Sequence, residues 1–283
     1  MRVLLTNDDG VGAAGLRAIR AELTRWCACV ITVAPAEDCS GFARKCTFSR
    51  PVEVRRLEGG AHPVYECDGT PADCVRVGLL GGLAADAGLV VSGINHGANL
   101  ADDVVYSGTV AAGLEAALLG TSALCLSQQS PPATLGVDRG DERDGRVSRY
   151  HFGPAARLGS GLAESIGAAR LAEPVVLNVN YPAAAAAAPG SQPATVLTRP
   201  GQRAYPRASM RDWDGDPGPQ HVYLFGGPDE VIPAADDGPD TDLATVRGGR
   251  ISVTPLSVAV GLDELAPAVT ALLGLLVGCT GAA

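Results

Sequence analysis

The 283-residue sequence predicts an α/β fold in which a mostly parallel sheet carries helices on both faces. Short apolar runs rich in branched residues alternate with segments of helical periodicity over residues 1–130. These runs are continuous instead of alternating with polar residues, which is typical of strands buried on both faces. Asn, Asp, Gly and Pro follow the runs and indicate turns.

Each predicted element has a local signal. The strands follow the apolar runs and cover residues 2–6, 29–34, 89–92, 123–127 and 174–179. One helix is expected at residues 15–25, where Leu16, Ile19 and Leu23 recur at helical spacing. A second begins after Thr70, because Thr70 suits the N-cap and Pro71 the first helical position. A third, with small residues on one side, is expected at 109–119.

The second half of the sequence has weaker patterns. Residues 128–150 are predicted to form a polar loop, and the alanine run at 183–188 a flexible insertion. Residues 199–250 have little periodicity and many Gly, Pro and Asp, so we expect an extended arm with a hairpin at 221–225. A strand at 250–254 and a helix at 262–277 complete the chain. The predicted organisation is a core at 1–198, the arm at 199–250, and a returning strand with a helix at 251–283.

Composition excludes several classes of partner. The net charge is −9 and the sequence contains no block of Lys and Arg, so we expect no nucleic-acid polymer as a partner. The N-terminus lacks the apolar region of a signal peptide, and the apolar stretch at 265–277 is too short to span a bilayer. We therefore expect no membrane association and a cytoplasmic location. The eight cysteines lack zinc-like spacing and are expected to be reduced thiols.

Polar clusters follow the predicted strands. They contain the carboxylates of Asp8 and Asp9, the hydroxyl of Ser40, the amides of Asn95 and Asn99, and the run Ser107-Gly108-Thr109. Taken alone, each cluster also fits an ordinary helix cap or turn. Ligands of parallel sheets bind at the carboxyl ends of the strands, so the clusters together indicate a binding site.

The donor types indicate the chemistry of that site. Oxygen donors from two Asp, one Ser and one Asn favour one Mg²⁺ or Mn²⁺ over Zn²⁺. The hydroxyls and backbone N–H groups of residues 107–109, at the start of a helix, suit a phosphate. A hard cation beside a phosphate cradle predicts hydrolysis of a phosphomonoester by water activated at the metal. Asp8 as a covalent nucleophile is the competing mechanism, although the phosphatases that use one place their second Asp two positions after the first.

Several motifs, in this order along the chain, together resemble the SurE (survival protein E) family of nucleotidases. They are Val3-Leu-Leu-Thr-Asn7-Asp8-Asp9-Gly10-Val11, Val33-Ala-Pro35 followed by Ser40-Gly41, Gly69-Thr-Pro-Ala-Asp-Cys-Val75, Val90-Val-Ser-Gly-Ile-Asn95-His-Gly-Ala-Asn99, Asp102-Asp103-Val-Val-Tyr106-Ser-Gly-Thr-Val110-Ala-Ala112, Leu177-Asn-Val-Asn180-Tyr-Pro182, Gly238-Pro-Asp-Thr-Asp242 and Ile251-Ser-Val-Thr-Pro-Leu256.

The resemblance implies a Rossmann-like fold and metal-dependent hydrolysis of nucleoside 5′- or 3′-monophosphates. It also implies homodimers or homotetramers formed through exchanged C-terminal arms. Matched by position, the metal ligands are Asp8, Asp9, Ser40 and Asn95, with Asp8 and Asp9 also catalytic. The phosphate-binding residues implied are Asn99, Ser107, Gly108 and Thr109. The late acidic motif adds Asp242 as a further catalytic residue.

The sequence departs from the family pattern at several positions. Asn99-Leu100-Ala101 stands where the family usually has Asn-Leu-Gly, and Asp240-Thr241-Asp242 replaces Gly-Thr-Asp. The segment after Gly41 is unusually basic, with Arg44 and Lys45. Two alternatives therefore remain: the same chemistry on a phosphorylated pathway intermediate that this segment selects, or a module that binds a nucleotide or phosphate without turnover. His96 is interpreted as a loop residue.

Overall fold

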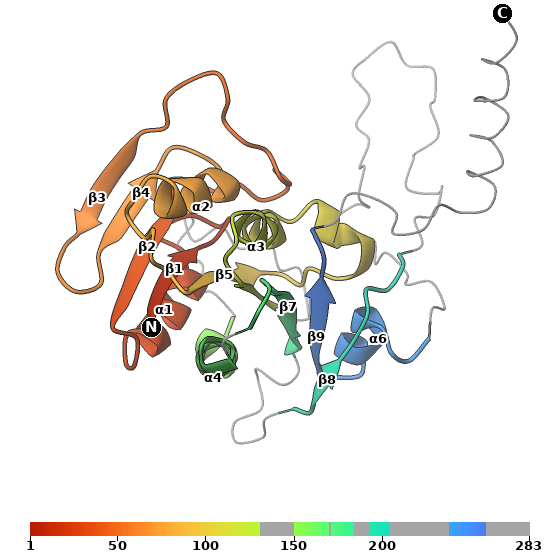
Figure 1. The fold of residues 1–283 in the computed structure, drawn as a ribbon. Coiled ribbons are helices and arrows are strands. Elements are labelled where there is room, and N and C mark those ends of the chain that lie inside the picture. Colours follow the sequence, from red (N-terminus) through yellow and green to blue (C-terminus); the bar gives the residue numbers. More distant parts are fainter. Residues whose placement is uncertain (131–149, 170, 184–192, 204–237, 259–283) are drawn as a thin grey trace, which may run out of the picture.

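The computed structural model describes residues 1–130, 150–169, 171–183, 193–203 and 238–258 (Figure 1). The predicted hairpin at 221–225 and the predicted final helix at 262–277 lie outside the described residues. So do residues 131–149, which are most of the predicted polar loop, and nearly all of the alanine run. None of the described helices combines the length and apolar character that crossing a bilayer requires.

A nine-stranded sheet forms the centre of the fold, in the order β3-β4-β2-β1-β5-β6-β7-β9-β8. The six central strands run parallel: β1 (Arg2–Thr6), β2 (Cys29–Pro35), β4 (Val64–Cys67), β5 (Leu89–His96), β6 (Ala123–Gln128) and β7 (Val176–Tyr181). At one edge β3 (Val54–Glu58) is antiparallel to β4. At the other edge β9 (Ile251–Leu256) is antiparallel to β7, and β8 (Thr195–Leu197) is parallel to β9.

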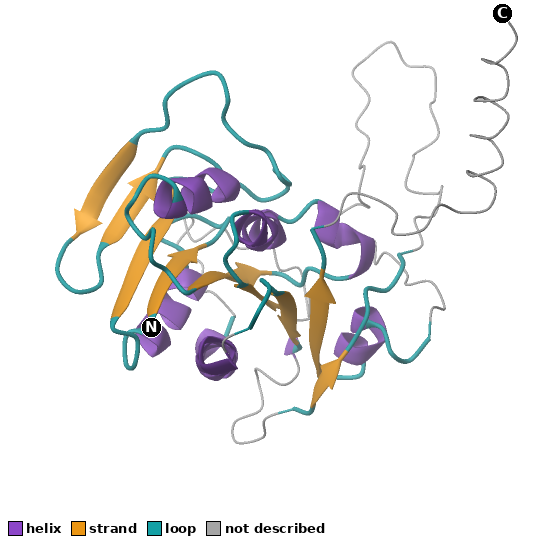
Figure 2. Ribbon diagram, viewed as in Figure 1, coloured by secondary structure: helices purple, strands orange, loops and turns teal. Residues whose placement is uncertain are grey.

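Helices cover both faces of the sheet (Figure 2). On one face α1 (Ala14–Leu23) and α4 (Phe152–Ala169) contribute to a core with Val3 and Leu5. On the other face α2 (Pro71–Leu79) and α3 (Gly108–Leu118) contribute to a second core with Leu4. Successive residues of β1 therefore point to opposite faces, which explains why its three central residues are all apolar.

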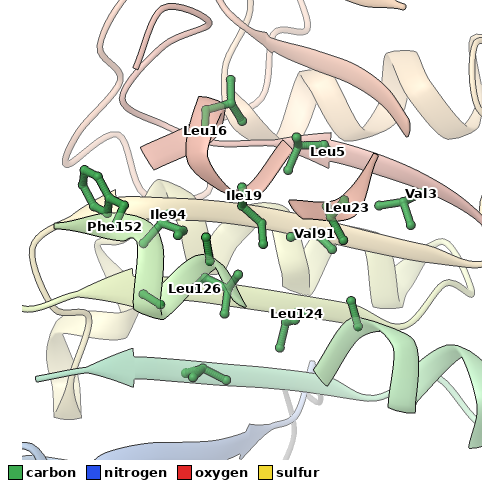
Figure 3. Packing of buried hydrophobic residues seen from close by; sticks show 14 of the residues in the cluster. Val3, Leu5, Leu16, Ile19, Leu23, Val91, Ile94, Leu124, Leu126 and Phe152 are labelled. Atoms are coloured by element: carbon green, nitrogen blue, oxygen red, sulfur yellow. The ribbon is translucent and has the colours of Figure 1, made fainter. Parts of the chain in front are cut away.

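The first core shows how α1 is positioned (Figure 3). Leu16, Ile19 and Leu23 are buried against the side chains of β1 and β5, as their helical spacing predicts. Gly15 allows this close packing, because a Cβ there would overlap the carbonyl oxygen of Ile94 in β5. This contact places the start of α1 directly against β5.

The predicted fold class is confirmed: the structure is an α/β fold with a mostly parallel sheet. The five strands predicted within residues 1–180 and the strand predicted at 250–254 form, with shifted ends, as do three helices predicted within residues 1–130. The helix after Thr70 has the expected cap, in which the Thr70 side chain accepts from the Asp73 N–H and the Asp73 carboxylate accepts from the Thr70 N–H.

Other elements were not predicted from the sequence. They are β3, β4, β8, α4, the 3₁₀ helix η1 (Ala101–Val105) and α6 (Asp242–Arg247). The predicted arm at 199–250 is described only at 199–203 and 238–250, and its last part contains α6, which lies against β9. The division of the chain into three segments remains a prediction, as does the formation of oligomers through the arm.

Candidate functional site

The carboxyl ends of β1, β2 and β5 meet at one edge of the sheet. In register, Thr6 at the end of β1 lies beside Ser92 of β5, and Leu5 lies beside Thr32 of β2. The turn after β1 carries Asp8 and Asp9, and Asn95 lies near the end of β5. The segment after β2 returns to this turn, because the Cys39 N–H donates to the Asp8 carbonyl oxygen at 2.7 Å.

Asp8 is buried at the amino terminus of α3, with only 3% of its surface exposed. The Thr109 N–H donates to Asp8 Oδ2 at 3.0 Å, and the Thr109 hydroxyl donates to Oδ1. A Cβ at Gly108 would lie 2.8 Å from the Asp8 Cβ, so the helix approaches Asp8 this closely only because residue 108 is glycine. The helix dipole favours a carboxylate at this end.

The pKa of Asp8 is nonetheless raised to about 7. Burial is the larger cause, since it disfavours the charged form, and the neighbouring charge of Asp9 is the second. The bonds from Thr109 act in the opposite direction but do not offset these two effects. Asp8 therefore occupies a position in which added positive charge would stabilise its ionised form.

Asp9 is hydrogen-bonded to His96, a residue whose sequence context predicts only a loop position. His96 Nδ1 lies 3.1 Å from Asp9 Oδ1, and the His96 N–H donates to Oδ2 at 3.4 Å. The imidazole packs against the rings of Tyr150 and Phe152, with centroids 5.1 and 5.0 Å away. The place of His96 between Asn95 and Gly97 was the one signal in the sequence that could have identified it.

Ser40 and Asn95 supply the two neutral oxygens of the predicted metal set. Ser40 is exposed and directly follows Cys39, the residue bonded to the Asp8 backbone. The Asn95 side-chain nitrogen donates to the Gly97 carbonyl oxygen at 2.9 Å. The Asn95 amide oxygen is therefore the side-chain atom that could contact a cation.

The predicted phosphate-binding residues adopt several different arrangements. The Asn99 amide nitrogen donates to Ser127 Oγ at 2.8 Å, which uses one of its two hydrogens. The Ser107 hydroxyl accepts from the Val110 N–H and caps α3. Thr109 directs its N–H and its hydroxyl to Asp8. The structure thus places Thr109 as a partner of Asp8, with Gly108 and Ser107 at the start of the same helix.

Asp242 is fully buried and bonded to backbone groups. Its Oδ2 accepts from the Ala101 N–H at 2.9 Å, and its Oδ1 accepts from the N–H groups of Gly201 and Leu243 at 2.8 and 2.7 Å. Ala101 has a left-handed backbone with φ of 53° and lies two residues after Asn99. These bonds suit a residue that holds the loop after β5.

The residues fit a hard divalent cation. Within the described part of the chain, no three His, Cys, Asp or Glu side chains are grouped to hold a metal, so a cation here depends on the mixed set of two carboxylates, a hydroxyl and an amide. All four are oxygen donors, as Mg²⁺ and Mn²⁺ prefer. The raised pKa of Asp8 agrees, because a cation would relieve the repulsion between the paired carboxylates.

Comparison with known proteins shows the family of the chain. The family model described as survival protein SurE matches residues 3–207. The chain belongs to the SurE family. It is 37% identical to the 5′-nucleotidase SurE of Laribacter hongkongensis, over 91% of this chain and 93% of that protein. It is 39% identical to the 5′-nucleotidase SurE of Rubrobacter xylanophilus, over 94% of this chain and 96% of that protein.

A solved SurE structure shows the same architecture. The crystal structure of the SurE protein from Aquifex aeolicus aligns with a TM-score of 0.73 and 28% sequence identity. The alignment covers 96% of this chain and 100% of that one. The resemblance stated from the sequence motifs is therefore confirmed at the level of the SurE family and its fold.

Proposed function

We propose that this SurE chain releases phosphate from nucleoside 5′- or 3′-monophosphates with the help of one Mg²⁺ or Mn²⁺. The observation that carries the proposal is the buried Asp8 at the amino terminus of α3, followed directly by the partly buried Asp9. This arrangement combines acidic oxygens for a cation with a helix end that suits a phosphate. The family supports the substrate class, since relatives of similar length bear the name 5′-nucleotidase SurE.

Asp8, Asp9, Ser40 and Asn95 would hold the cation. When bound there, such an ion supplies positive charge that polarises a phosphoryl oxygen and acidifies water. Thr109 keeps the Asp8 carboxylate in one orientation, and His96 does the same for Asp9. Because both Asp8 oxygens accept bonds from Thr109, the geometry favours Asp8 as a fixed ligand over Asp8 as a covalent nucleophile.

The phosphoryl group would lie against the start of α3. Because the N–H groups of Thr109 and Val110 already donate to Asp8 and Ser107, the donors for its oxygens would be the Gly108 N–H, the Ser107 hydroxyl and the second hydrogen of the Asn99 amide. Donors aligned in advance stabilise developing negative charge, and removing one costs about 3 kcal/mol of transition-state stabilisation. Asp242 would act at a distance, by holding the loop that carries Asn99.

Phosphate release from a substrate panel tests the proposal. The panel contains nucleoside 5′- and 3′-monophosphates, sugar phosphates and short polyphosphate, each with Mg²⁺, Mn²⁺ or EDTA. We expect turnover of the monophosphates with a divalent cation and none with EDTA. Equal activity in EDTA would contradict the requirement for a cation. A preference for sugar phosphates would contradict the proposal that the substrate is a nucleotide. Binding without release would identify a non-catalytic module.

Assembly into homodimers or homotetramers through the segment 199–250 is part of the same proposal. Its support is the weak periodicity of this segment's sequence, although its described residues 242–247 pack against β9 as α6. Size-exclusion chromatography with light scattering, run on the full chain and on a variant without residues 204–237, tests it. The full chain should elute as an oligomer and the variant as a smaller species. A monomeric full chain would contradict the proposed role of this segment in assembly.

A further inference from the structure

Glu115 is a buried carboxylate within α3 whose side chain is only 2% exposed. Its Oε1 lies 2.6 Å from Arg76 Nη2, and its Oε2 lies 3.3 Å from Arg44 Nη2. A charged group is buried at high cost unless it is paired, so the two arginines explain how Glu115 is tolerated. Both arginines are partly exposed and come from different parts of the chain: Arg76 from α2 and Arg44 from the segment after β2.

Arg44 belongs to residues 39–47, here called the Ser40 loop. The loop begins at Cys39, whose N–H donates to the Asp8 carbonyl oxygen, and ends at Thr47, whose N–H and hydroxyl donate to the Asp73 carboxylate at 2.9 and 2.7 Å. Between these ends the Ala43 N–H donates to the Tyr106 carbonyl oxygen at 3.2 Å. Ala43 has φ of 51°, a left-handed conformation that an alanine adopts only when neighbouring contacts hold it.

We propose that Glu115 is a positioning residue that, through Arg44, holds the Ser40 loop in place over Asp8. The amino terminus of α3 binds Asp8 through Thr109, and a later turn of the same helix binds Arg44 through Glu115. An α-helix is rigid over two turns. The helix therefore sets the position of Ser40 relative to Asp8. This inference rests on the proposed function, because Ser40 acts there as a cation ligand.

The same ion pair explains the basic segment after Gly41. The sequence left open whether Arg44 binds a substrate phosphate. In the structure the Arg44 guanidinium faces Glu115, and Lys45 Nζ lies 4.9 Å from the centre of the Phe42 ring. The Lys45 carbonyl oxygen accepts from the Thr70 hydroxyl at 2.6 Å, which attaches the loop to the cap of α2. Arg44 thus stabilises the conformation of the Ser40 loop.

Arg44→Ala and Arg76→Ala form a matched pair, because each removes one of the two cations bound to Glu115. For Arg44→Ala we expect amide hydrogen exchange in residues 39–47 to be about tenfold faster, since the loop loses its bond to α3. We also expect about tenfold weaker Mn²⁺ binding by calorimetry and a higher KM, with kcat retained at saturating Mn²⁺. Arg44→Lys, which keeps the charge, should recover part of each change.

Arg76→Ala is the control, and it should leave exchange in the loop and Mn²⁺ binding unchanged. Equal effects of the two variants would overturn the proposal. They would show that losing either arginine beside Glu115 has the same consequence, so that the contact between Glu115 and the Ser40 loop has no special role. Unchanged exchange in Arg44→Ala would overturn it as well. Hydrogen exchange is measured without substrate and therefore tests the role of Glu115 independently of activity. If the wild-type chain released no phosphate, the proposed function would be refuted, and hydrogen exchange would still decide whether Glu115 holds the loop.

Discussion

The Thr109 N–H donates to Oδ2 of Asp8 at 3.0 Å, across 101 positions of the sequence. This bond joins the turn after β1 to the amino terminus of α3. It lies where two opposing effects meet, because the helix end favours a negative charge while burial disfavours it.

Gly108→Ala should reduce phosphate release by about a hundredfold or more, because the new Cβ would lie 2.8 Å from the Asp8 Cβ and displace the carboxylate. Gly161→Ala is the matched control in α4, where a Cβ meets nothing within 4 Å. That variant should gain up to about 1 kcal/mol of unfolding free energy and keep its activity. Steady-state rates and urea unfolding measure both, and an active Gly108→Ala protein would contradict the close contact.

Asp8 should make the metal-free protein less stable as pH rises. Its pKa is about 7 in the folded protein and 3.8 in the unfolded chain, so the folded state binds more protons between these pH values. The stability that protonated Asp8 contributes is complete below about pH 4 and is lost as pH rises through 7. In EDTA, the unfolding free energy should therefore fall across this range in wild type, and Asp8→Asn should lack this component of the fall.

Added Mn²⁺ provides the control for this prediction. At pH 8 it should raise the melting temperature of wild type, because the cation stabilises the ionised pair of carboxylates. The shift should be much smaller in Asp8→Asn, which should also lose phosphate release. Parallel pH curves for the two proteins in EDTA would show that Asp8 does not carry the raised pKa.

Asp242→Asn should lower kcat/KM by about tenfold without altering the shape of its pH profile. The amide keeps one acceptor, so part of the bonding to Ala101, Gly201 and Leu243 is lost and the loop before η1 loosens. A changed pH profile would instead mean that Asp242 takes part in proton transfer. Asp242→Ala leaves three buried N–H groups without this acceptor and should lose about 3 kcal/mol of unfolding free energy.

Ala101→Gly should raise the free energy of unfolding by up to about 1 kcal/mol, because φ at Ala101 is 53° and glycine adopts this conformation without strain. Ala18→Gly, in the interior of α1, is the control and should lower that free energy by about 1 kcal/mol. Urea unfolding of both variants gives the comparison. Destabilisation by both would show that the left-handed residue is not strained.

Much of the fold could be predicted because its signals are local. The apolar run at 2–6 and the cap formed by Thr70 and Asp73 each act within a few residues. β3 was missed because four of its five residues are exposed and it lacks an apolar face. In α4, Gly and Ala contribute much of the buried surface, so its periodicity is faint.

The sequence by itself determined the fold class, the SurE resemblance and the residues that carry the candidate chemistry, since strand ends and oxygen donors can be recognised from residue type and order. Only the tertiary structure decided which of these side chains meet. It placed Thr109 on Asp8, His96 on Asp9, and Arg44 on Glu115, and it buried Asp242 among backbone N–H groups. The physical reason is that such contacts join distant segments, and their geometry depends on how strands and helices pack.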